Sequence, residues 1–278
     1  MFISVEEVSK IYELNDKSIS VALEKVDLSI EEGKFICLLG PSGCGKTTLL
    51  NMIAGFDKPS TGAIKINGND VSQPSIDRIA IFQNFGLLPW RTVIKNVELG
   101  LESKGFDEKK RREIAEGYLE LVGLSNYKDH HPHQLSGGMQ QRIAIARALA
   151  VDPKILFMDE PFGALDAMTR MTMQDEIERI WQEKKKTIIF VTHDIEEAVF
   201  LADRIVVMTA GPGKVKKIID VPLARKRDRT SHGFLVIRDE VFREFELKSI
   251  DKMEHYLQQS QSEIPIQHQA SDVLVFHT

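Results

Sequence analysis

The sequence predicts an α/β fold built around a parallel sheet. Four short apolar runs, rich in β-branched residues, have the length and composition of buried strands: 35–40, 154–159, 187–193 and 203–209. Segments with helical periodicity, at 166–185 and 194–202, separate the later runs. Because a parallel strand is reached through a crossover connection, strands that alternate with helices indicate a parallel sheet.

Length and composition fit this fold class. The chain has 278 residues, of which 42% are hydrophobic and 28% are charged, as is typical of a globular protein that buries a core. The formal charge of −5 gives no basic field, so we expect no nucleic-acid partner. The sequence has neither a signal-peptide pattern at its start nor an apolar stretch of about 18 residues, so we expect any membrane contact to run through a partner.

The remaining segments extend this core. Strands are predicted at 18–30 and 62–68, and the helical, charged pattern of 87–151 indicates a helical insertion. After residue 210 come a glycine–proline turn, a basic run and an amphipathic segment near 235–259, which we interpret as an appendage with a tail. The basic run is either a solvated loop or a surface for anionic lipid headgroups, and it comprises Lys214, Lys216, Lys217, Arg225, Lys226, Arg227 and Arg229.

A glycine-rich loop follows the strand at 35–40 and opens a helical run. Its residues fit the pattern G-x-x-x-x-G-K-[ST], and they are Gly40, Pro41, Ser42, Gly43, Cys44, Gly45, Lys46 and Thr47. Glycines let backbone N–H groups curl around phosphate oxygens, and the helix adds its positive end. We expect Lys46 to reach the β- and γ-phosphates, Thr47 to bind Mg²⁺ and Thr48 to bond a phosphate. ATP with Mg²⁺ is the expected ligand.

The two cysteines, Cys37 and Cys44, are too few and too close together for a disulfide framework, which favours a reducing compartment. Cys44 lies inside the glycine-rich loop, where a helix N-terminus can lower a thiol pKa and favour oxidation. We favour the alternative, that Cys44 fills a tolerant position.

Two carboxylates end the apolar strand at 154–159. The carboxyl edge of a parallel sheet is where ligands bind, so Asp159 and Glu160 are expected beside the phosphate loop. Adjacent residues of an extended strand point to opposite sides, which predicts different roles for the two acids. We expect Asp159 to face Mg²⁺ and Glu160 to activate an attacking water.

A third motif gives the chain a family resemblance. The run Leu135-Ser136-Gly137-Gly138-Met139-Gln140-Gln141-Arg142 is similar to the LSGGQ signature of the ABC ATPases, with Met139 in place of the usual Gln. A helical run follows it, so Ser136, Gly137 and Gly138 would offer a hydroxyl and N–H groups at a helix N-terminus, a second anion site. The resemblance implies a head-to-tail dimer in which this helix closes on the partner's ATP.

Four further residues occupy the positions of family landmarks in the expected order. The resemblance implies that Tyr12 stacks on adenine, that Gln83 contacts Mg²⁺ and the attacking water, and that Asp166 reaches across the dimer. It also implies that His193 reads the γ-phosphate, so that Glu160, His193 and Gln83 are the catalytic residues. The similarity covers roughly residues 2 to 215.

The resemblance also implies an architecture, that of the P-loop NTPases. It consists of a RecA-like parallel sheet core with an antiparallel β subdomain and a helical subdomain, followed here by a C-terminal tail. We expect the antiparallel β subdomain and the first part of the core at 2–86, and the helical (signature) subdomain at 87–151. The rest of the core would then span 152–215, and the C-terminal appendage 216–278.

Four segments, 74–83, 87–90, 161–170 and 193–205, resemble the nitrate, sulfonate and taurine importer branch, which has bicarbonate relatives. This implies an ATP-hydrolysing subunit at the cytoplasmic face of the plasma membrane. Its implied partners are a second copy or a paralogous ATPase, transmembrane permease subunits and, indirectly, an extracytoplasmic solute-binding protein. The apolar group Leu87, Leu88 and Trp90 either docks a partner or closes the helical subdomain's own core.

The rival interpretation is a soluble ABC ATPase that acts on nucleic acid or ribosomes. Ribosome-type members resemble two fused cassettes, and DNA-repair members carry a long coiled coil. This chain has one compact cassette without sustained heptads, which favours the importer.

Overall fold

A six-stranded sheet forms the centre of the computed structural model, which describes residues 1–14, 17–82, 85–163 and 165–245. Its strands, in spatial order, are β10 (Val215–Asp220), β9 (Arg204–Met208), β3 (Phe35–Leu39), β8 (Thr187–Thr192), β7 (Ile155–Asp159) and β6 (Arg78–Ile81). Strand β10 pairs antiparallel with β9, and all other neighbours pair in parallel. The predicted parallel sheet is confirmed.

The central strands are apolar throughout because both of their faces are covered. Every residue of β3, β7 and β8 is buried. Alternate side chains of β3 enter different cores: Phe35, Cys37 and Leu39 join the larger cluster, whereas Ile36 and Leu38 join the smaller one. Helix α1 (Lys46–Ala54) packs in the smaller cluster, and α5 (Ala167–Lys184) and α6 (Ile195–Leu201) pack in the larger one.

A second sheet, of four strands, covers the smaller core in the order β2-β1-β4-β5. Its strands are β1 (Ile3–Glu13), β2 (Ile19–Ile30), β4 (Thr61–Ile66) and β5 (Asn69–Asp70), and all neighbours pair antiparallel. The β1–β2 register shifts at several points, and Glu7 and Lys25 there have positive φ. Bulges of this kind break the alternation of a strand, which is why β1 was not predicted from the sequence.

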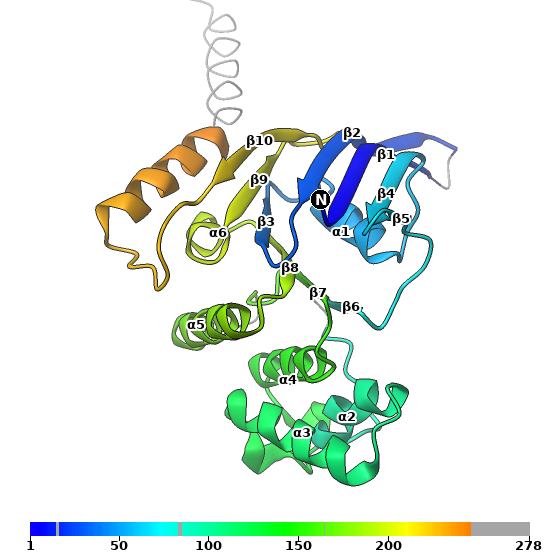
Figure 1. Ribbon diagram of the computed structural model, residues 1–278, viewed down its shortest axis with the longest axis vertical. Coiled ribbons are helices and arrows are strands. Elements are labelled where there is room, and N and C mark those ends of the chain that lie inside the picture. Colours follow the sequence, from blue (N-terminus) through cyan, green and yellow to red (C-terminus); the bar gives the residue numbers. More distant parts are fainter. Residues whose placement is uncertain (15–16, 83–84, 164, 246–278) are drawn as a thin grey trace, which may run out of the picture.

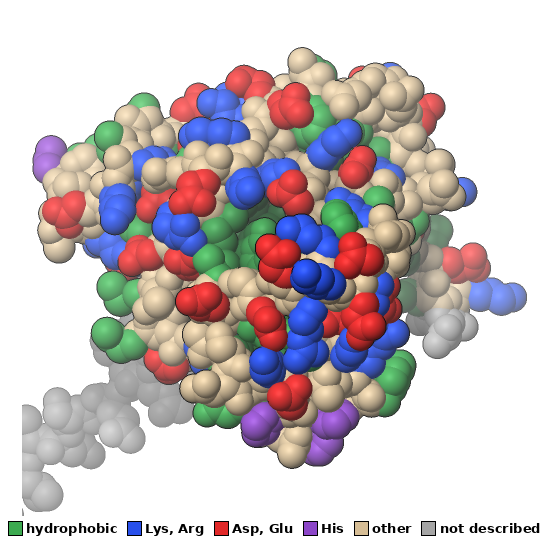
Figure 2. All heavy atoms as spheres, turned by 60° about the horizontal axis from the view of Figure 1, so that its bottom comes forward, with side chains coloured by type: hydrophobic (Ala, Val, Ile, Leu, Met, Phe, Trp, Pro, Cys, Tyr) green, Lys and Arg blue, Asp and Glu red, His purple; other side chains and the backbone are tan. Residues whose placement is uncertain are grey.

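The helical insertion forms the lower part of Figure 1. It contains α2 (Val93–Ser103), α3 (Glu108–Leu121), α4 (Gly137–Ala150) and two 3₁₀ turns, Ser125–Tyr127 and Pro132–Gln134. Asp107 caps α3 and Ser136 caps α4 through side-chain bonds to backbone N–H groups. On the face that Figure 2 shows, Lys, Arg, Asp and Glu side chains are intermixed. Several are paired, as in Arg112–Glu116 and Lys128–Glu116.

The first part of the C-terminal segment packs on the core. The expected boundary at residue 215 falls at the start of β10, which extends the central sheet. A helix at 232–245 then packs Phe234, Ile237 and Val241 into the larger core. The far end of the predicted amphipathic segment, and the tail, lie outside the described residues. Across the described residues, no helix has the length and apolarity needed to cross a membrane.

Candidate functional site

The glycine-rich loop lies between β3 and α1, where the sequence placed it. Gly45 is the N-cap of α1 and has a left-handed conformation with φ +90°. A Cβ there would lie 2.6 Å from Leu23 Cδ2 and 2.9 Å from the carbonyl oxygen of Ala22, so both conformation and space require glycine. The loop therefore presents backbone N–H groups at the start of α1, as a phosphate site requires.

Lys46 begins α1 and is only 6% exposed. Its ammonium donates hydrogen bonds to the carbonyl oxygens of Gly40 (2.7 Å) and Pro41 (3.0 Å). The Lys46 ammonium is thus fixed by the backbone of the loop. An anion bound in the loop would contact this positive charge.

A cavity of about 330 Å³ adjoins this loop. Its lining combines the loop, the start of α1 and the end of β7: Ala22, Ser42, Gly43, Cys44, Gly45, Lys46, Thr47, Thr48, Asp159 and Glu160. The predicted phosphate loop and the two predicted carboxylates therefore share one site.

Asp159 and Thr47 contact each other in the lining of this cavity. The Thr47 hydroxyl donates to Asp159 Oδ1 over 3.1 Å. Asp159 is largely buried, and burial raises its pKa above the usual range, although the Thr47 bond opposes that shift. A hydroxyl and a carboxylate at this spacing are the oxygen donors that Mg²⁺ prefers.

Glu160 departs from the geometry expected of an extended strand. Strand β7 ends at Asp159, and Glu160 has φ 47°, so the two acids do not alternate across a strand; both line the same cavity. The turn nevertheless gives them different partners, because Glu160 Oε1 lies 3.1 Å from His193 Nδ1. Glu160 also lines a second cavity, of about 110 Å³, together with Thr192 and His193.

Cys44, within the loop, is buried, and burial raises the pKa of its thiol. The possibility that a helix N-terminus lowers this pKa is therefore wrong, because desolvation outweighs the nearby Lys46 charge. The packing interpretation is the one that fits.

Tyr12 lies beside this site on β1. Its hydroxyl donates to Asp57 Oδ2 over 2.9 Å, and the Lys10 ammonium lies 4.8 Å from the ring centroid. Burial and the Asp57 bond raise the pKa of Tyr12, and the Thr48 hydroxyl, from the cavity lining, acts in the opposite direction. The ring is partly exposed.

The signature residues are not part of this arrangement. Ser136 and Gly137 are exposed at the start of α4, and none of the three residues 136–138 lines the phosphate-loop cavity. Asp166 caps α5 by accepting a bond from Thr169 N over 2.9 Å, and its carboxylate is exposed. Gln83, the remaining predicted site residue, lies outside the described residues.

Comparison with known proteins decides the family. The ABC transporter family model matches residues 23–163. The chain belongs to the ABC transporter family. An uncharacterized ABC transporter ATP-binding protein of Methanocaldococcus jannaschii is 52% identical over 239 residues, which is 86% of this chain and 89% of that protein.

The relatives include ATP-binding proteins whose names state the transported ion. The bicarbonate transport ATP-binding protein CmpD of Synechocystis is 46% identical over 82% of both chains. The nitrate import ATP-binding protein NrtD of Synechococcus elongatus is 43% identical over 83% of this chain and 84% of that one. The resemblance to the nitrate and bicarbonate branch is confirmed.

Solved structures show the same fold. The dimeric ABC transporter cassette MJ0796 has a TM-score of 0.74 and 36% identity, covering 80% of this chain and all of that one. A dimer of the same cassette in a post-hydrolysis state, bound to ADP and phosphate, has a TM-score of 0.72 and 35% identity with the same coverage. As an ABC family member of this type, the chain is an ATP-binding and ATP-hydrolysing subunit.

Proposed function

We propose that this chain drives an importer for a small anion or organic solute, of the nitrate, bicarbonate, sulfonate or taurine kind, as one half of a nucleotide-sandwich dimer. One observation carries the proposal. The phosphate loop shares its cavity with Asp159 and Glu160, whereas Ser136 is exposed on a separate helix N-terminus and lines no part of that cavity. A second copy, or a paralogue, that brings its own Ser136–Gly138 helix end would complete the site.

The residues of the cavity fit ATP with Mg²⁺. The backbone N–H groups of Ser42, Gly43 and Gly45 would face the phosphates. Lys46 would neutralise the β/γ oxygens, and Thr47 with Asp159 would hold the ion, joined by Gln83. When bound, Mg²⁺ would neutralise charge on the phosphates. Tyr12, held by Asp57 beside Thr48, would stack on the adenine.

Glu160 and His193 would perform hydrolysis. Glu160 borders both the phosphate-loop cavity and the cavity of His193, so its carboxylate can orient a water between γ-phosphate and imidazole. His193 bonds the same carboxylate and is more than half exposed, and it can therefore turn to donate to the γ-phosphate. Asp166, exposed at the start of α5, would contact the partner copy.

Docking to permease subunits would use the loop before α2, which would place the chain at the cytoplasmic face of the membrane. Trp90 in this loop is 72% exposed, whereas Leu87 packs against the larger core and Leu88 is half-buried. The burial of the leucines supports the interpretation that they close the subdomain, and the exposure of Trp90 leaves its ring free for the proposed docking.

ATP-dependent dimerisation of three variants tests the proposal. Glu160→Gln should bind ATP without cleaving it and sediment as a dimer in analytical ultracentrifugation. Adding Ser136→Arg should leave ATP binding intact but keep the protein monomeric, because Ser136 lies outside the phosphate cavity. Adding Lys46→Ala instead should abolish both. A Glu160→Gln/Ser136→Arg protein that still forms ATP-dependent dimers would refute the sandwich arrangement.

A further inference from the structure

A buried polar network surrounds the end of β8, next to His193. Its centre is Glu197 of α6, which is 6% exposed. One carboxylate oxygen accepts from the Thr192 hydroxyl over 2.8 Å, and the other accepts from the Gln174 amide of α5 over 3.2 Å. Both oxygens of this buried carboxylate are therefore satisfied by residues from two other elements.

Thr192 and Asp194 flank His193 and belong to this network. The Thr192 hydroxyl accepts from Asp194 N over 3.0 Å, and Asp194 Oδ1 accepts from Glu197 N over 3.1 Å. The residues on both sides of His193 are thus hydrogen-bonded to Glu197 through their side chains. Because His193 itself bonds Glu160, any shift of Glu197 would move the imidazole against that carboxylate.

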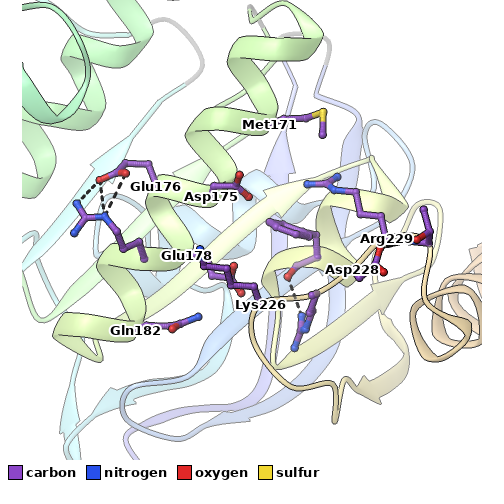
Figure 3. Close-up of a pocket in the computed structure, with 12 residues that line it drawn as sticks. Met171, Asp175, Glu176, Glu178, Gln182, Lys226, Asp228 and Arg229 are labelled. Atoms are coloured by element: carbon purple, nitrogen blue, oxygen red, sulfur yellow. Dashed lines mark hydrogen bonds and ion pairs between the residues drawn. The ribbon is translucent and has the colours of Figure 1, made fainter.

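The network continues outward to the C-terminal part of the chain. Gln174 is 1% exposed, and its carbonyl oxygen accepts from Arg229 Nη2 over 2.7 Å. The Arg229 guanidinium also lies 3.9 Å from the centroid of the Phe200 ring. Figure 3 shows the Arg229 side chain reaching from the C-terminal segment toward α5, at the wall of a cavity of about 690 Å³.

Residues 225–229, the C-terminal strap, are fixed to the same helices at two more points. Arg227 is buried, and its guanidinium donates to the carbonyl oxygens of Val199, Phe200 and Ala202 at the end of α6. Arg225 pairs with Glu178 of α5 (3.1 Å) and with Asp203 (2.8 Å). These arginines face the protein, so this part of the basic run is neither a solvated loop nor a lipid surface.

Loss of any one hydrogen bond in this network would be costly. A buried polar group that loses its partner costs about 1–3 kcal/mol, so each member holds the next in one position. Glu197 also faces the Arg170 guanidinium at 3.8 Å and the Asp194 carboxylate, and its pKa is raised chiefly by burial. Removing one of its partners would leave this buried carboxylate uncompensated, which is strongly destabilising.

We propose that Glu197, Gln174 and Arg229 are positioning residues for His193, so that the C-terminal strap controls how the imidazole meets the γ-phosphate. This rests on the role assigned to His193 in the proposed function. The hydrogen-bonded route runs from Arg229 through Gln174 and Glu197 to Thr192, the residue before His193.

Steady-state ATPase kinetics of single variants form the first part of the test. Glu197→Ala, Gln174→Leu and Arg229→Ala should each lower kcat, on the order of tenfold for Glu197→Ala, because misplacement of a reacting group costs rate. The KM for ATP should change by less than about twofold, since the phosphate loop and Lys46 are untouched. Arg229→Lys, which keeps the donor, should recover part of the rate. Arg179→Ala, on the same helix, should leave kcat unchanged, because the ion-pair partners of Arg179 among the described residues are the half-buried Glu176 and the exposed Glu183.

The second part repeats the substitutions in a His193→Ala background. There they should cause no further loss of kcat, because residues that act through one side chain are not additive. Equal losses in both backgrounds, together with a lowered Tm, would show that the network only stabilises the fold and would overturn the proposal. A His193→Ala protein with wild-type kcat would instead refute the role of His193 itself.

Discussion

The Thr47 hydroxyl donates a hydrogen bond of 3.1 Å to the Asp159 carboxylate, which joins two residues that lie 112 positions apart in the chain. One belongs to α1 and the other ends β7, and the central sheet brings them together. Sequence motifs assigned both to Mg²⁺ without showing that they touch.

Asp159→Asn should weaken binding of the ion without destabilising the fold. Because burial raises the pKa of Asp159, the ionised form is disfavoured in the folded protein, and removing the charge should raise Tm at neutral pH in the absence of Mg²⁺. This gain should shrink as pH falls through the raised folded-state pKa, and it should vanish below the usual Asp range, where wild type is protonated in both the folded and unfolded states. Scanning calorimetry across pH measures it.

The same variant should lose the response to the ion. In wild type, Mg²⁺ with ATP should raise Tm, whereas in Asp159→Asn the added effect of Mg²⁺ over ATP alone should be small. An equal Mg²⁺ effect in both proteins would contradict the assignment of Asp159 as a ligand.

Gly213 supports the phosphate loop from outside it. Its N–H donates to Ala22 O and its carbonyl accepts from Glu24 N, both at 3.0 Å, and a Cβ would lie 2.0 Å from the carbonyl oxygen of Cys44. Gly213→Ala should therefore displace the loop, lower stability by about 1–3 kcal/mol and weaken ATP binding. Gly211→Ala is the matched control, because a Cβ there meets nothing within 4 Å. Isothermal titration calorimetry with ATP compares the two variants. Equal affinities would show that the phosphate loop accommodates the added methyl group without losing ATP binding.

The thiol of Cys44 should be unreactive at neutral pH. Its pKa is raised by burial, so less thiolate is present than in a free cysteine at the same pH. Iodoacetamide labelling followed by mass spectrometry should be slower than for free cysteine and should accelerate only above the usual thiol range. Cys37→Ala isolates the signal, although Cys37 is also buried and its pKa is raised. Rapid labelling at pH 7 would show that the loop opens.

Most of the site could be predicted from local sequence motifs. The rest depends on contacts between residues that are distant in the sequence. The glycine-rich loop and the acids at the end of β7 are contiguous in sequence, so their spacing alone indicated their chemistry. The left-handed turn at Glu160 depends on its bond from Glu160 N to Val191 O, which no local pattern shows. The sequence likewise indicated a surface charge at Arg227, because three of its four carbonyl partners lie more than 20 residues away in sequence.

Trp90 should decide whether the loop before α2 is a docking surface. The loop is held rigidly by buried Asn96, whose amide donates to the carbonyl oxygens of Leu88, Arg91 and Thr92 at 3.1 Å each. An exposed ring on a fixed loop can bind a partner without an ordering cost. Trp90→Ala should therefore reduce the fraction of the chain that sediments with membranes and that co-purifies with co-expressed permease subunits. Asn96→Leu should do the same by releasing the loop.

Basal ATPase activity of Trp90→Ala should stay at the wild-type level, because the ring does not line the cavity of the phosphate loop. Phe242→Ala serves as the control, since Phe242 is another exposed aromatic, on the helix at 232–245, and its loss should not change membrane association. If Trp90→Ala and Phe242→Ala associate with membranes as wild type does, the tryptophan is not the anchor. The importer would then have to engage its permease through another face of the helical subdomain.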